Sequence, residues 1–149
     1  MLALSQVRNR DKISAKIIGE GDFSEALKTL ILGLGLEETV HFDNQSYPVR
    51  EIPQLLADCN LGLVPLEISS ITNYALPLKL LEYTSLGLPV VTVRSAAITY
   101  YFREEDCLFY QWDDPASLAA ILDRVAEKPE LLLPYRHKAV ALREKFLWS

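Results

Sequence analysis

Apolar residues in this chain fall into two alternating patterns. Short, mostly apolar runs, typical of buried strands, occur at residues 13–18, 40–42, 61–65, 90–93 and 108–110. Apolar positions at helical spacing predict helices at residues 2–7, 23–34, 48–59, 115–126 and about 130–146, and a further helix that begins at Pro77 and ends before Gly87. Residues 94–102 fit either a loop or a short helix.

This alternation indicates a fold class. Strands that are apolar along their whole length belong to parallel sheets whose two faces are both covered by helices. The sequence therefore predicts a Rossmann-like, doubly wound α/β domain that spans residues 1–149 as one unit. In such sheets ligands bind beyond the carboxyl ends of the strands, so we expect function in the loops after Ile18, Val64, Val93 and Tyr110.

The stretch from Leu76 to Val93 carries the most informative chemistry. Lys79 and Glu82 are three residues apart and therefore neighbours on one helix face, close to a helix start that favours phosphate. Lys79 could add a positive charge beside a diphosphate, and Glu82 could accept hydrogen bonds from two ribose hydroxyls. By local pattern alone, a simple surface ion pair explains the two residues as well.

A second turn, Gly19-Glu20-Gly21, follows the first predicted strand. The dinucleotide fingerprint needs a third glycine three residues after the second, and this chain has Ser24 there. An NAD site is therefore disfavoured, and a tight strand-to-helix turn explains the two glycines as well as a ligand contact does.

Composition and charge narrow the function classes. Hydrophobic residues make up 50% of the chain and the formal net charge is −5, with no stripe of basic and aromatic residues. We therefore expect a globular domain that does not bind nucleic acid and does not span a membrane. Cys59, Cys107, His41 and His137 lack metal-ligand spacing, so we expect no metal site, and the two cysteines suit a reducing, cytoplasmic compartment.

The same stretch resembles a family signature. Residues 76–93 are similar to the donor-binding motif of the group 1 glycosyltransferases (family 4, GT-B fold), a Pro-x-Lys-x-x-Glu-Tyr segment before Gly-x-Pro-Val-Val. The similarity continues in order along the chain. It includes the Gly19–Gly21 turn, the segment 52–65, Asp113-Asp114-Pro115 and the closing Phe146-Leu147-Trp148.

This resemblance implies the C-terminal, nucleotide-sugar-binding domain of a carbohydrate-biosynthesis transferase, incomplete at its N-terminus. The donor would be a nucleoside diphosphate sugar, no cofactor or metal would be needed, and an absent N-terminal lobe would bind the acceptor and provide any peripheral membrane association. The resemblance places the donor nucleotide at Pro77, Leu78, Lys79 and Glu82. It places the sugar or phosphates near Gly19, Gly21, Asn73, Tyr74 and Ala75.

Two departures from the family pattern keep alternatives open. Tyr74 stands where the common motif has an acidic residue, and Arg94-Ser95-Ala96-Ala97 replaces a glycine pair. A non-catalytic domain of the same fold, used for binding or assembly, would explain both. An unrelated doubly wound module such as a receiver domain is disfavoured, because its cluster of acids at strand ends is missing.

Overall fold

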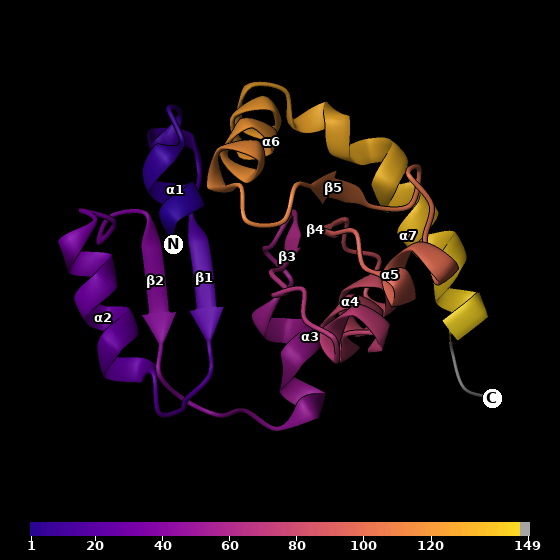
Figure 1. Cartoon of the computed structure of the whole chain (residues 1–149), viewed down its shortest axis with the longest axis horizontal. Helices are drawn as coiled ribbons and strands as arrows, with labels where there is room; N and C mark the ends of the chain where they lie inside the picture. Colours follow the sequence, from indigo (N-terminus) through magenta and orange to yellow (C-terminus); the bar gives the residue numbers. More distant parts are fainter. Residues whose placement is uncertain (147–149) are drawn as a thin grey trace.

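The structure, a computed structural model, describes the backbone of residues 1–146 and the side chains of residues 1–143. The closing Leu147-Trp148 of the family pattern lies outside the described residues. Strands and helices alternate along the chain, as predicted, and Figure 1 shows the strands as two separate groups.

All strand pairing within the described residues is parallel. The strands are β1 (Ala15–Ile18), β2 (Val40–Asp43), β3 (Gly62–Val64), β4 (Val90–Val93) and β5 (Leu108–Tyr110). β1 pairs with β2, and β3, β4 and β5 form a second sheet in that order. Between β1 and β3 no ladder forms in residues 1–146, so each of these strands has one edge without a strand partner there.

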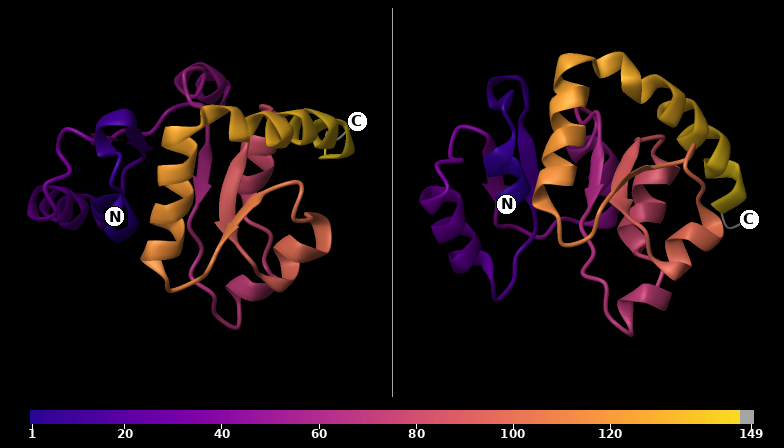
Figure 2. Two further views of the ribbon diagram at one scale, coloured as in Figure 1. Left: turned by 90° about the horizontal axis from the view of Figure 1, so that it is seen from above. Right: turned by 45° about the horizontal axis from the view of Figure 1, so that its top comes forward.

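The helices connect these strands and cover them. They are α1 (Leu2–Gln6), α2 (Ser24–Gly33), α3 (Ile52–Leu55), α4 (Leu78–Ser85), α5 (Ala96–Tyr101), α6 (Pro115–Glu127) and α7 (Leu133–Phe146). Four 3-10 turns also occur, η1 (Arg10–Lys12), η2 (Val49–Glu51), η3 (Thr72–Tyr74) and η4 (Pro129–Leu132). The views in Figure 2 show α6 and α7 passing over the three-stranded sheet.

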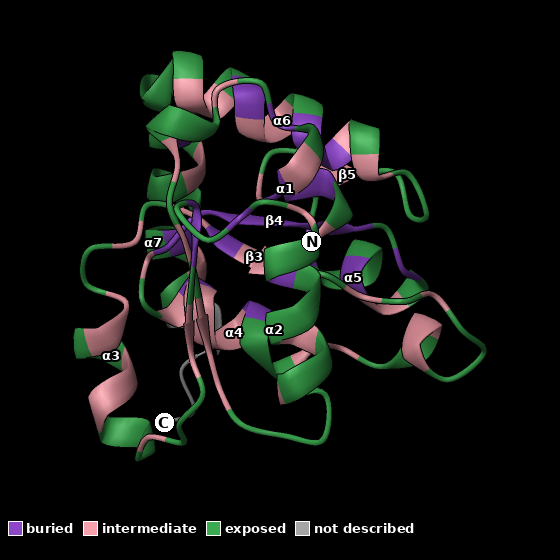
Figure 3. Ribbon diagram, turned by 90° about the vertical axis from the view of Figure 1, so that its left-hand side faces the viewer, coloured by how far each residue is buried: buried purple, intermediate pink, exposed green. Residues whose placement is uncertain are grey.

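The core centres on β4, which is buried on both faces (Figure 3). On one face Val90 packs in a cluster with Leu80 of α4 and Ile98 of α5. On the other face Val91 packs with Ala3 of α1 and Leu118 of α6. Helices therefore cover both faces of the three-stranded sheet, as the continuous apolar run predicted.

Local chemistry determines two helix ends. Gly87 adopts a left-handed conformation (φ 72°) just after α4, as the sequence predicted for the residue that ends this helix. Asp114 caps α6, because its carboxylate accepts hydrogen bonds from the Ala116 and Ser117 amides at 3.0 and 3.2 Å.

Several predicted boundaries need correction. The helix expected at residues 48–59 is η2 followed by the four-residue α3, and Val49 of its expected apolar face is 86% exposed. Pro77 is the residue before α4 and not its first helical residue. The last helix is divided into η4 and α7. Residues 94–102, which fitted either a loop or a short helix, contain α5.

A buried carboxylate fastens the start of the chain to α6. Asp123 is 4% exposed and accepts hydrogen bonds from the backbone amides of Arg8 and Asn9 at 3.0 and 2.9 Å. The Asn9 side chain donates another at 3.0 Å. Burial alone would raise the pKa of Asp123, but these hydrogen bonds outweigh it and hold the pKa below its usual value.

We expect Asp123→Asn to reduce the pH dependence of stability. A lowered folded-state pKa means that the charged form stabilises the fold above the unfolded-state pKa, and that this stability is lost as the pH falls through the folded-state value. Urea unfolding should show the variant to be less stable at pH 7 by about 1–2 kcal/mol. The gap should close as the pH falls below the usual pKa range of an aspartate. A gap that stays constant with pH would contradict this assignment.

We expect Gly62→Ala to destabilise the fold. A Cβ added to Gly62 would lie 2.8 Å from Cγ of the Tyr83 ring, because α4 packs this ring directly against β3. The free energy of unfolding should fall by about 1–3 kcal/mol in chemical denaturation. Gly33→Ala is the matched control, since a Cβ there meets no atom within 4 Å, and it should leave stability unchanged or raise it.

Candidate functional site

The start of α4 presents a polar face on a rigid base. Leu80 is fully buried beneath this helix and Thr84 is 2% exposed, so the inner side of α4 is held in the core. Leu78, by contrast, is 73% exposed, and no side chain caps the first turn in the described structure. The Leu80 amide donates to the Pro77 carbonyl at 3.1 Å, so the Leu78 and Lys79 amides are the ones available to an anionic group.

Lys79 and Glu82 meet on this exposed face. The Lys79 ammonium lies 2.7 Å from Oε2 of Glu82, and the two side chains are 59% and 43% exposed. The structure thus brings together the two residues that the sequence predicted as neighbours. An exposed pair of this kind stabilises a helix by only about 0.2–0.5 kcal/mol, so stability alone gives little reason for it.

The loop at residues 67–75 leads from β3 into α4. Tyr74 is 75% exposed at its end, and Ile71 is 80% exposed. Asn73 has a different role, because its side-chain oxygen accepts a hydrogen bond from the Ala96 amide at 2.9 Å. The structure therefore joins this loop to the segment that follows β4.

That segment contains contacts that sequence reasoning missed. Arg94 forms a two-pronged ion pair with Glu104, with nitrogen to oxygen distances of 3.1 and 2.8 Å, and its guanidinium lies 4.9 Å from the centre of the Phe109 ring. Ser95 caps α5 by accepting a hydrogen bond from the Ile98 amide at 3.1 Å. The glycine pair of the family pattern is thus replaced by an ordered, capped helix start.

The Gly19–Gly21 turn belongs to the other sheet. Gly19 (φ 145°) donates its amide to the Asp43 carbonyl at 3.1 Å, and Gly21 donates to the Ser24 hydroxyl at 3.2 Å. The tight-turn interpretation of these glycines is therefore confirmed. The hydrogen bonds of the turn join it to β2 and α2. Its expected proximity to the sugar or phosphates stays a prediction.

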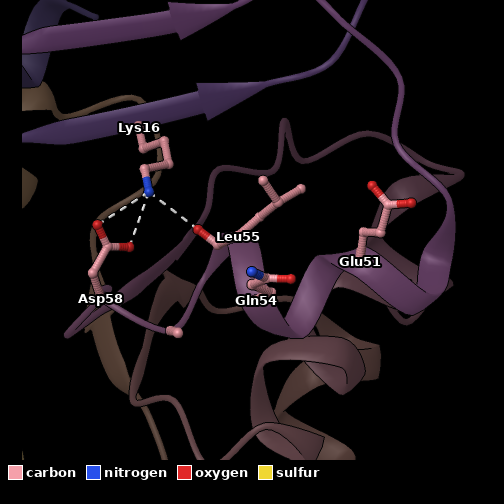
Figure 4. Close-up of a pocket in the computed structure, with 6 residues that line it drawn as sticks. Lys16, Glu51, Gln54, Leu55 and Asp58 are labelled. Atoms are coloured by element: carbon pink, nitrogen blue, oxygen red, sulfur yellow. Dashed lines mark hydrogen bonds and ion pairs between the residues drawn. The ribbon is translucent and has the colours of Figure 1, made fainter.

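One hollow in the surface lies away from these residues. An open depression of about 460 Å³ lies between β1 and α3, where the Lys16 ammonium contacts the Asp58 carboxylate at 2.9 Å and the Leu55 carbonyl at 3.1 Å (Figure 4). The hydrogen bond between the two charged side chains raises the pKa of Lys16 and lowers that of Asp58. These contacts pair the charges of Lys16 and Asp58 with each other.

Residues 1–146 lack both a metal-ligand cluster and a membrane-spanning helix. This part of the chain contains no group of three potential metal ligands, and none of its helices is long and apolar enough to cross a membrane. Cys107 is buried, and burial raises the pKa of its thiol to about 12, so this cysteine acts as a core residue.

Solved structures share this fold. HepE from Anabaena, solved with UDP and glucose, superposes with a TM-score of 0.75 at 22% identity, over 96% of this chain and 38% of its own. The catalytic domain of cholesterol-α-glucosyltransferase from Helicobacter pylori gives 0.78 at 16% identity, over 98% of this chain and 87% of its own. The C-terminal domain of LpcC, a group 1 family protein from Francisella tularensis, gives 0.78 at 16% identity, over 97% and 75%.

Sequence comparison agrees with this structural likeness. No curated protein matches the sequence, but the family model described as "Glycosyl transferases group 1" matches residues 1–128. The chain covers little more than a third of HepE, so it corresponds to one part of such an enzyme. From the family match and the shared α/β fold, we conclude that this chain belongs to the group 1 glycosyltransferases, where it corresponds to the C-terminal domain of the GT-B fold.

Proposed function

We propose that this chain binds the donor for a glycosyltransferase that moves a sugar from a nucleoside diphosphate to an acceptor. The observation that carries the proposal is the exposed Lys79–Glu82 pair on the first turn of a helix whose other side is buried. The uncapped amides near Pro77 and Leu78 would receive the diphosphate, with Lys79 beside it and Glu82 on the ribose. The UDP and glucose bound to HepE support a donor of this class.

The ion pair is compatible with donor binding. Lys79 occupies Oε2 of Glu82, and in the described structure no hydrogen bond is made to Oε1. A carboxylate accepts up to about four hydrogen bonds and an ammonium donates three, so each group retains capacity for a ligand. Glu82 could therefore hold ribose hydroxyls while Lys79 bridges from Glu82 to a phosphate oxygen.

This arrangement stabilises a leaving group. As the bond between sugar and diphosphate breaks, negative charge grows on the diphosphate oxygens. Helix amides and the Lys79 ammonium placed there in advance stabilise that charge without rearrangement, and this requires no metal. We propose a metal-independent transfer on this basis, with any catalytic base supplied by another part of the enzyme.

Completion of the site requires further protein. β1 and β3 each have an edge without a strand partner in residues 1–146. In a doubly wound sheet of order 3-2-1-4-5-6, the first strand lies between strands 2 and 4. β1 and β3 resemble strands 2 and 4 of that order. We propose that a strand before α1 fills this place and that an N-terminal lobe binds the acceptor. We also propose that the protein is cytoplasmic and that this lobe provides any association with a membrane.

The second candidate function is a non-catalytic domain used for binding or assembly. Tyr74 at the acidic position and the capped helix start after Arg94 favour it, because both change the region where the sugar would lie. Titration of the intact protein with UDP-, GDP-, ADP- and dTDP-sugars separates the two candidates. Binding of at least one donor supports the transferase, whereas binding of none supports the non-catalytic domain.

We expect Glu82→Ala to weaken binding of the preferred nucleotide. Loss of hydrogen bonds to a charged acceptor should lower the affinity roughly 10- to 100-fold, for the nucleoside diphosphate and its sugar conjugate alike. Calorimetric titration measures this directly. The matched control is Glu25→Ala, which removes an ion pair of the same spacing and length, 2.7 Å to Lys28, on α2. An unchanged affinity in Glu82→Ala would exclude a ribose contact.

We expect Lys79→Ala to act only on phosphate-bearing ligands. Removal of the ammonium should weaken the nucleoside diphosphate roughly 10-fold but leave the phosphate-free nucleoside unchanged, since Lys79 would touch no other part of it. Competition against a fluorescent nucleotide measures both ligands. Lys28→Ala is the control on α2, and an equal loss for nucleoside and diphosphate would contradict the assignment.

A further inference from the structure

We infer that Asn73 is a positioning residue that holds the sugar side of the donor site in place. The inference rests on the proposed donor-binding function. Asn73 belongs to one of the two segments that would border the sugar, the loop at residues 67–75, and contacts the other, the segment that begins at Arg94. Its side-chain oxygen accepts a hydrogen bond from the Ala96 amide at 2.9 Å, and so connects them.

The loop is ordered within itself. The Thr72 hydroxyl accepts a hydrogen bond from the Ser69 amide at 2.8 Å and donates one to the Glu67 carbonyl. The Ser69 hydroxyl in turn accepts the Thr72 amide at 3.1 Å. These bonds give the loop a defined shape, but they do not determine where the loop lies relative to α5.

The core holds the two ends of this loop and leaves its tip outside. Leu66 and Leu76, at either end, pack against the cluster around Val90. Ile71 and Tyr74 at the tip are 80% and 75% exposed, so burial does little to fix the tip. Asn73 is half-buried and supplies the polar link at this point.

α5 is the fixed partner in this link. Ile98 is fully buried beneath α5, and the Ser95 side chain caps its first turn without help from the loop. The loop is therefore anchored to α5, and not α5 to the loop. Since the loop leads directly into α4, Asn73 also determines how Tyr74 and Ala75 approach the first turn of that helix.

This geometry changes the role expected for Asn73. The sequence placed Asn73 among residues near the sugar or phosphates. In the structure its side-chain oxygen is occupied by Ala96, so this atom holds protein to protein. Loss of that bond should release the loop tip and disturb contacts with the sugar, while the nucleotide contacts of Lys79 and Glu82 on α4 remain.

The test compares Asn73→Leu, similar in size but unable to accept a hydrogen bond, with Asn73→Asp, which keeps an acceptor oxygen. The first readout is amide hydrogen exchange at Ala96, without ligand. This amide is in the first turn of α5 and has no partner within its helix, so its protection reports on Asn73. Exchange should be at least about ten-fold faster in Asn73→Leu and near the wild-type rate in Asn73→Asp.

The second readout is affinity for the preferred nucleoside diphosphate and for its sugar conjugate. Asn73→Leu should weaken the conjugate about ten-fold more than the nucleotide, and Asn73→Asp should restore the wild-type ratio. Unchanged exchange at Ala96, or equal losses for both ligands, overturns the inference. A wild-type protein that binds no nucleotide would instead refute the donor function, and the exchange result would still decide whether Asn73 anchors the loop.

Discussion

The complete burial of β4 is the constraint on which the rest of this domain depends. None of its four residues is more than 2% exposed, and the one hydroxyl among them, on Thr92, donates to the Val64 carbonyl at 3.0 Å. A strand buried this fully needs a helix on each face, which α4 and α5 provide on one and α1 and α6 on the other. The candidate site is built on the outer surface of that covering.

Elements that are buried in the core could be predicted from the apolar pattern of the sequence. Elements that stay exposed to solvent could not. The runs that became β3, β4 and β5 are continuous because neighbours bury both faces, and that signal is local. The segment at residues 48–59 has helical spacing too, but it contributes to none of the buried clusters in the described structure. Because this segment lacks such burial, α3 ends at Leu55 despite the helical spacing of its apolar residues.

The same distinction applies to the candidate site. Lys79 and Glu82 were predictable as a pair because a helix places residues three apart side by side. The link from Asn73 to Ala96 crosses 23 residues, and the pair of Arg94 with Glu104 crosses a helix and a turn. Such contacts depend on where two strands end relative to each other, which single-residue patterns do not encode. The Asp114 and Ser95 caps, by contrast, had local signals, a capping residue at a helix start.

The two faces of α4 explain how the proposed donor site can use a weak surface pair as a binding group. Leu80 and Thr84 fix the helix from below, so in the proposed donor site the free amides at the start of α4 are held in place before a ligand arrives. The polar face above contributes almost nothing to stability and is free to be optimised for a ligand. Rigidity therefore comes from the buried face, and in the proposed donor site recognition comes from the exposed one. For electrostatic stabilisation of a leaving diphosphate, that separation matters because donors fixed in advance need no reorganisation as charge develops.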